Sequence, residues 1–281
     1  MPDRLRLGVA LLLPAPIAHE VDGLRRALDD RSRERIPPHL TLVPPVNVRR
    51  DRLSEALGVL RAAAAGAPAP LVVTLGPPAT FLPDNPVVYL PVSGDGGDIT
   101  ALRDRVWKPP LVRSLTWPFV AHVTLADDMA PARIDAALAA LGGFRVEVPF
   151  DAVSLLIERR PGPFWVPLAD AALGPPAVVA GGPLAVELVR SRHIDPEGLA
   201  LLAAEAVEAP PAAELVVTAR REGSVVGVAW AWRTPDGCRA QVLVDAAHRR
   251  QGIGRFLDNA LEMAVAGTGW GCRYPRLTGS G

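Results

Sequence analysis

The spacing of apolar positions divides the chain into alternating strand-like and helix-like segments. Period-two alternation, or short apolar runs between turn residues, predicts strands at 4–13, 36–46, 70–76, 86–92, 117–128, 144–149, 151–158 and 164–168. Spacing near 3.6 residues, together with proline and glycine at the ends, predicts helices at 17–30, 50–66, 98–107 and 131–143. This mixture of elements indicates an α/β (α+β) domain over residues 1–172.

A change in composition then marks a boundary. Residues 173–183 are small, uncharged and rich in proline and glycine, which is typical of a linker. Beyond them, the same periodicities predict strands at 184–192, 214–221, 225–233 and 238–244, and helices at 195–209 and 253–265. We therefore expect a second α/β domain over residues 184–281.

One pattern occurs twice in the first domain. His39 and Thr41 in "PPHLTL" are matched by His122 and Thr124 in "AHVTLA". With 5 histidines in 281 residues, a His-x-Thr triplet is expected by chance only roughly 0.2 times, so two copies are informative. Because side chains alternate between the faces of a strand, each histidine shares a face with its threonine.

The two motifs carry the chemistry that opening a phosphodiester requires. Imidazole has an ordinary pKa of ~6.5, so one of two paired histidines can be a neutral base and the other a charged acid. A threonine hydroxyl on the same face can donate a hydrogen bond to a phosphate oxygen. For either motif taken alone, an edge strand with a polar outer face is the alternative.

The motifs resemble those of the 2H phosphoesterase superfamily, in particular its 2′-5′ RNA ligase and RNA 2′,3′-cyclic phosphodiesterase-like branch. The resemblance covers residues 1 to about 172, and it implies two pseudo-symmetric lobes that each bring one motif strand to a central cleft. It also implies that His39 and His122 form the acid–base pair, that Thr41 and Thr124 bind the phosphate, and that no metal ion takes part. Ala121 stands where many relatives have proline.

Five other residues of this domain could contact a substrate. Arg33 and Arg35 precede the first motif and could bind RNA phosphates, although a solvated charge cluster is the alternative. Phe81, Tyr89 and Trp165 could stack on a base, but packing in the core is what we expect of each.

A second signature lies in the C-terminal domain, where Arg249-Arg250-Gln251-Gly252-Ile253-Gly254 follows a predicted strand and opens a predicted helix. Small residues let the backbone approach a pyrophosphate, and the helix start offers free N–H groups. The run resembles the diphosphate-binding turn of the GNAT N-acetyltransferase family, in which the preceding strand faces the pantetheine arm. The resemblance implies acetyl-CoA as cofactor and a binding site made of Leu243, Val244, Arg249, Arg250, Gln251, Gly252, Ile253, Gly254 and Arg255.

The GNAT pattern is followed by a short segment, residues 267–281, where relatives continue with a strand, a helix and a final strand. Tyr274 is the one tyrosine there that could protonate a departing thiolate. We therefore expect an incomplete GNAT-like domain that binds CoA weakly, with no efficient acetyl transfer unless a partner chain completes it.

Composition narrows the class of protein. The net charge of +0 gives no overall field for tight nucleic-acid binding. Cys238 and Cys272 are too few for a disulfide framework or a zinc site, and the apolar N-terminal run is too short to span a membrane. We expect a cytoplasmic protein that is not membrane-bound and whose oligomeric state stays open.

The first domain is accordingly expected to hydrolyse a cyclic phosphate at an RNA or nucleotide end. Two other functions stay open. One is an N-acetyltransferase whose first domain recruits a nucleotide-bearing substrate. The other is a non-catalytic protein that binds RNA ends or nucleotides.

Overall fold

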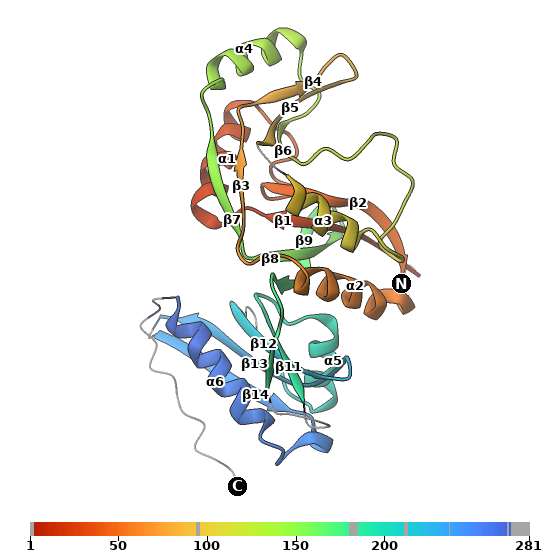
Figure 1. Ribbon diagram of the computed structural model, residues 1–281, viewed down its shortest axis with the longest axis vertical. Helices are drawn as coiled ribbons and strands as arrows, with labels where there is room; N and C mark the ends of the chain where they lie inside the picture. The colour runs from red at the N-terminus through yellow and green to blue at the C-terminus, as the bar shows by residue number, and fades with distance from the viewer. Residues whose placement is uncertain are drawn as a thin grey trace. The chain divides into compact units, whose positions relative to one another are not determined.

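The computed structural model describes residues 3–93, 96–179, 185–210, 213–235, 237–268 and 270. Cys272 and Tyr274 lie outside these residues. The chain divides into two compact units, Met1–Pro167 with Leu173–Pro175, and Leu168–Ala172 with Pro176–Gly281 (Figure 1). Within the described part of the chain, none of the helices is both long and apolar enough to cross a membrane.

A nine-stranded sheet, in the order β7-β3-β5-β6-β2-β1-β8-β9 with β4 on β5, supports the first unit. Its strands are β1 (Arg4–Leu12), β2 (His39–Arg49), β3 (Leu71–Leu75), β4 (Ala79–Phe81), β5 (Asn85–Ser93), β6 (His122–Ala126), β7 (Val146–Phe150), β8 (Ala152–Arg159) and β9 (Phe164–Ala172). Neighbouring strands from β7 to β8 pair antiparallel. The two lobes of the sheet meet where β2 pairs with β6, so each lobe places one motif strand at the junction.

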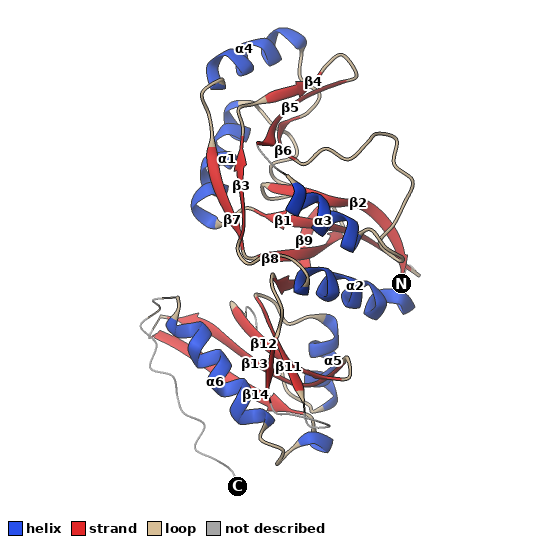
Figure 2. Cartoon of the chain, in the orientation of Figure 1, coloured by secondary structure: helices blue, strands red, loops and turns tan. Residues whose placement is uncertain are grey.

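Four helices, coloured blue in Figure 2, cover this sheet: α1 (Ala15–Ala27), α2 (Leu53–Ala65), α3 (Gly97–Val106) and α4 (Pro131–Leu141). A single 3-10 turn, η1 (Arg50–Arg52), leads from β2 into α2. The α2 helix packs against β8 and α3, because Leu57 and Leu60 lie with three alanines on one buried stripe. The α1 helix contacts β6, and α4 contacts β5.

The motif strands are shorter at their N-terminal ends than the predicted ranges 36–46 and 117–128. The β2 strand begins at His39 because Pro37 and Pro38 have no N–H to donate to a sheet. The β6 strand begins at His122, four residues after Pro118. The β4 strand lies between the predicted strands 70–76 and 86–92, in a stretch for which no element was predicted.

The second unit has a five-stranded antiparallel sheet in chain order: β10 (Ala177–Val179), β11 (Val186–Ser191), β12 (Leu215–Arg221), β13 (Ser224–Thr234) and β14 (Gly237–Val244). The helices α5 (Pro196–Ala204) and α6 (Ile253–Ala266) pack on its opposite faces. Val217 and Ala219 of β12 face α6, whereas Val216 faces α5. A Cβ on Gly227 of β13 would lie 2.8 Å from Leu257 Cδ1, so a glycine there lets α6 pack closely.

The presence of β10 corrects one prediction. We expected residues 173–183 to be a linker, but Ala177–Val179 pair antiparallel with β11. These residues contain neither glycine nor proline, and valine favours the extended conformation, so this part of the segment extends the sheet.

Candidate active site

The two His-Thr motifs meet at one pair of residues in the sheet. Leu40 of β2 is paired with Val123 of β6, and both side chains are completely buried, at 0% exposure. The residues on either side of this pair, His39 and Thr41 on β2, and His122 and Thr124 on β6, are only partly buried. Because the strands run antiparallel, each histidine lies opposite the threonine of the other motif. The predicted alternation of faces is confirmed.

Each imidazole is held by the same backbone contact. His39 Nδ1 lies 2.8 Å from the Pro37 carbonyl oxygen, and His122 Nδ1 lies 2.7 Å from the Val120 carbonyl oxygen. A carbonyl oxygen only accepts hydrogen bonds, so Nδ1 carries the proton in both neutral rings. The Nε2 atom is therefore left to act as a base when the ring is neutral, and as an acid when the ring is charged.

The two histidines differ in how strongly their surroundings oppose a positive charge. Burial lowers the pKa of His39 to about 4, and the positive charges of Arg25 and His122 act in the same direction. Burial also lowers the pKa of His122, by a smaller amount, while its hydrogen bond to Val120 raises it. At neutral pH the His39 ring is therefore neutral and its Nε2 is free to accept a proton, whereas His122 keeps its proton to higher pH than His39 does.

Two aromatic rings enclose His122. Phe81 and Tyr89 are stacked with their ring centroids 4.0 Å apart, and each ring centroid lies 5.2 Å from that of His122 in an edge-on arrangement. These rings cover one side of the imidazole and contribute to the burial that lowers its pKa. We expected both rings to pack in the core; Tyr89 is buried and Phe81 is partly buried.

Two cavities adjoin the histidines. A cavity of about 260 Å³ is lined by His39 and Thr41, and also by Arg35 and Trp165. A larger cavity of about 710 Å³ is lined by His122 and Thr124, and also by Phe81, Trp117, Asp84, Asp127 and Asp128. Asp127 lines both cavities. Trp117, 62% exposed, offers an aromatic surface to the larger one.

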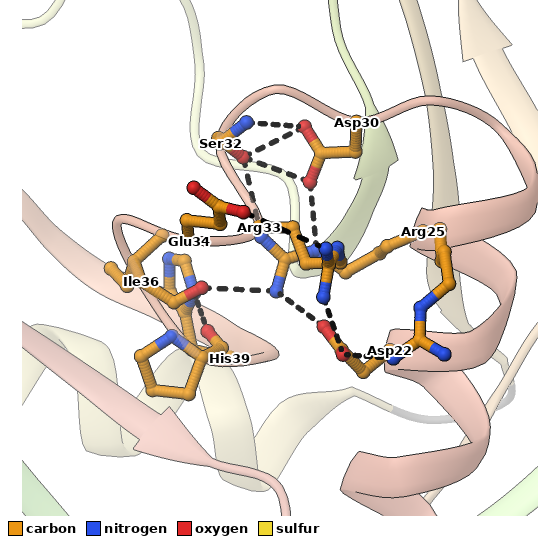
Figure 3. A network of polar contacts seen from close by, with 10 residues as sticks. Asp22, Arg25, Asp30, Ser32, Arg33, Glu34, Ile36 and His39 are labelled. Atoms are coloured by element: carbon orange, nitrogen blue, oxygen red, sulfur yellow. Dashed lines mark hydrogen bonds and ion pairs between the residues drawn. The ribbon is translucent and has the colours of Figure 1, made fainter.

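A buried polar network next to His39 was missed by the sequence analysis. Arg25 of α1 is 2% exposed and contacts Asp30, Ser32 and Ile36 in the segment that leads to His39 (Figure 3). A signal for it exists in the sequence: Arg25 lies four residues after Val21, so it falls on the apolar stripe of the predicted helix. A charged residue on a buried stripe indicates a buried partner.

Arg33, one of the two arginines considered as phosphate ligands, forms ion pairs with Asp22 and Glu34. Arg35 instead donates a hydrogen bond to the Pro163 carbonyl oxygen at 3.3 Å and lines the smaller cavity. The structure thus brings Arg35, but not Arg33, into the wall of a cavity that His39 also lines.

The glycine turn of the second unit leads from η3 (Ala246–His248) to α6. Gly252 precedes α6 with a φ of 81°, a conformation that favours glycine. A helix start presents N–H groups without an intrahelical acceptor and the positive end of the helix dipole. The backbone of this turn is therefore suited to an anion.

The side chains of the expected CoA site have other neighbours. Ile253 is buried in the core, and Leu243 and Val244 pack into clusters on opposite faces of the sheet. They are not gathered on one surface. Gly254 lies in the first turn of α6, close to Val244.

The polar residues of this turn are partly engaged by the rest of the unit. Arg249 donates to the Val244 carbonyl oxygen at 3.1 Å and forms an ion pair with Glu205. Gln251 accepts a hydrogen bond of 2.7 Å from Arg221. The remaining two members of the expected set, Arg250 and Arg255, are exposed.

Comparisons with known proteins agree with both motifs. Residues 13–162 match the 2'-5' RNA ligase superfamily, and residues 187–277 match the acetyltransferase (GNAT) family. A predicted phosphoesterase of Bacillus pumilus is 30% identical over 126 residues, covering 45% of this chain and 72% of the relative. Another, of Bacillus mycoides, is 26% identical over 164 residues, covering 58% of this chain and 94% of the relative.

A search of solved structures also finds similar chains. The apo form of E. coli LigT has a TM-score of 0.45 and 21% identity, covering 62% of this chain and 99% of LigT. The match to the 2'-5' RNA ligase superfamily spans more than half of the chain. The chain therefore belongs to the 2'-5' RNA ligase superfamily of 2H phosphoesterases, and its residues 187–277 match the GNAT family.

Proposed function

We propose that the first unit hydrolyses a cyclic phosphodiester, an RNA or nucleotide 2′,3′-cyclic phosphate, by acid–base catalysis between His39 and His122. The observation that carries this proposal is the Leu40–Val123 pairing, which puts two histidines and two threonines on one face at a junction of two strands. No metal ion is assigned a role in it. The superfamily membership supports a phosphoesterase, and the specific reaction is our inference.

The reaction can be written with atoms in balance. His39 Nε2 accepts a proton from water while the water oxygen forms a bond to phosphorus. The bond from phosphorus to one ribose oxygen breaks, and the Nε2–H of protonated His122 supplies the proton that this oxygen needs. Hydroxyl groups of Thr41 and Thr124 donate hydrogen bonds to the other phosphate oxygens as negative charge grows. The product is a phosphate monoester.

The two cavities suggest how the substrate is oriented. The larger one has the volume, and in Trp117 the aromatic surface, for a nucleoside. Its carboxylates, Asp84, Asp127 and Asp128, can accept hydrogen bonds from amino groups of a base, and they disfavour additional phosphates there. We infer that the nucleoside lies on the His122 side.

A panel of cyclic nucleotides tests the proposal. The purified chain is expected to open 2′,3′-cyclic nucleotides and to leave 3′,5′-cyclic AMP intact. The five-membered ring of the first and the six-membered ring of the second place the leaving ribose oxygen at different positions relative to the nucleoside. Trp117→Ala should raise KM for the 2′,3′-cyclic substrate with little change in kcat. Equal activity on both ring types would contradict the proposal.

A second proposal concerns the GNAT-family unit, which we infer binds the diphosphate of CoA at the turn around Gly252. The family match and the conformation of the turn support this inference. Calorimetric titration with CoA is the test, and binding is expected at high micromolar to millimolar ligand. If no heat of binding appears at millimolar CoA, the unit acts as a scaffold.

A further inference from the structure

Arg25 is the most buried cation near either histidine. Its Nε donates to Asp30 Oδ2 at 2.8 Å, its Nη1 donates to the Ile36 carbonyl oxygen at 3.0 Å, and its Nη2 donates to Ser32 Oγ at 3.3 Å (Figure 3). Asp22 Oδ1 lies 3.7 Å from Nη1. A single guanidinium thus links the end of α1 to three points of the following segment.

Asp30 organises the other side of this network. It is buried, and its carboxylate also accepts hydrogen bonds of 2.9 Å from the backbone N–H and the hydroxyl of Ser32. The contacts of Arg25 extend to Ile36, one residue before Pro37, whose carbonyl accepts the hydrogen bond from His39 Nδ1. The network therefore fixes the backbone that orients the His39 ring.

The same network sets charges beside His39. Arg25 on α1 opposes a positive charge on this imidazole, and so does His122 on β6. Asp30 favours a positive charge, but its effect is smaller than that of Arg25. Arg35 and Asp127, of opposite charge, line the same cavity as His39.

We propose that Arg25 is a positioning residue that holds the segment leading to His39, and that its charge adds to the effect of burial in opposing a positive charge on the imidazole. The effect of Arg25 on turnover rests on the proposed function, whereas its effect on the charge and orientation of the His39 imidazole does not. Arg25 touches no substrate in this scheme, and it acts through His39. The neutral amide of glutamine cannot replace the charge of Arg25. The ammonium group of lysine cannot reproduce the hydrogen bonds that the planar guanidinium donates to three partners.

The test is a pH titration of the histidine rings by NMR, with the His39 signal assigned from its loss in His39→Gln. Arg25→Gln is expected to raise the pKa of His39, because the opposing charge is removed. Asp30→Asn is expected to lower it, because the favourable charge is removed while Arg25 remains. Ser32→Ala is the matched control. It removes a hydrogen bond of the network without changing a charge, so the pKa of His39 should stay the same.

Two further variants keep the proposal open to refutation if a single variant does not fold. Arg25→Gln combined with Asp30→Asn leaves no unpaired buried charge, and it should still raise the pKa of His39 because the Arg25 effect is the larger. Arg25→Lys should leave the pKa of His39 unchanged and slow turnover, since lysine preserves the positive charge but not the three hydrogen bonds of the guanidinium.

The outcomes separate this inference from the proposed function. Opposite shifts in Arg25→Gln and Asp30→Asn support the inference even if the chain opens no cyclic phosphate. Where activity is present, the acid limb of kcat/KM should move with the NMR titration. The inference would be overturned if Arg25→Gln and Asp30→Asn shift the pKa of His39 in the same direction. It would also be overturned if that pKa is unchanged in Arg25→Gln or in the double variant.

Discussion

Leu40 and Val123 are directly paired across two antiparallel strands, and neither exposes any surface to solvent. Their burial fixes which face of β2 and β6 carries the histidines. A slip of either strand by one residue would turn its histidine into the core and its leucine or valine outward. The apolar residues of the two motifs thus specify the register on which the polar residues depend.

Replacing either histidine should remove most turnover without unfolding the chain. We expect His39→Ala and His122→Ala each to lower kcat by about 10²-fold to 10⁴-fold, the range typical of losing one proton-transfer group. Circular dichroism and thermal melting check the fold. His19→Ala, on the exposed side of α1, is the matched control and should keep full activity. A His39→Ala or His122→Ala variant with full rate rules out the paired mechanism.

The threonines should contribute through their hydroxyl groups. Thr41→Val and Thr124→Val keep the β-branched shape of the strand and remove one donor to the phosphate, so kcat/KM should fall by about 10-fold to 10²-fold. Thr41→Ser and Thr124→Ser restore the hydroxyl and should recover much of the loss. If serine is no better than valine at these positions, packing and not hydrogen bonding explains the effect.

The pH profile of kcat/KM should be bell-shaped with its maximum on the acid side of 6.5. His39 must be neutral, and its pKa of about 4 places the acid limb near pH 4. His122 must be protonated, and its lowered pKa places the alkaline limb below 6.5. The profile of kcat should lie at higher pH, because bound phosphate favours charged imidazole. Initial rates from pH 3.5 to 9 check this, and a kcat/KM maximum above pH 7 contradicts it.

CoA binding by the second unit should depend on the turn before α6. Gly252→Glu places a carboxylate where we expect the diphosphate and strains a backbone with φ 81°, so binding should be lost. Gly223→Glu is a matched control, because Gly223 has the same φ of 81° in the turn between β12 and β13. Calorimetry compares the two, and equal loss in both variants would show that strain alone is responsible.

The elements of the fold could be predicted because their signals are local. Leu57 and Leu60 mark the buried stripe of α2 in the sequence, and the alternation around His39 marks β2. The β10 strand was missed because Val178 and Val179 stand among prolines and glycines, and only pairing with β11 extends them. Such a short strand has no pattern of its own.

The site could be predicted only in part for a related reason. His39 and His122 could be singled out as candidates because the motif occurs twice. The pairing of Leu40 with Val123 depends on the order of strands in the sheet, and spacing along the chain does not give that order. The network of Arg25 joins a helix to a loop, and the rings of Phe81 and Tyr89 reach His122 from other strands. Their contacts follow from tertiary packing.

The measurement that tests the central claim most directly is phosphorus NMR of an RNA oligonucleotide ending in a 2′,3′-cyclic phosphate, incubated with the full chain and an excess of chelator. We expect the cyclic-phosphate signal to be replaced by a single monoester signal with the wild-type chain, and to persist with His39→Ala and with His122→Ala. An unchanged cyclic phosphate with the wild-type chain, or conversion that the chelator stops, would contradict the account.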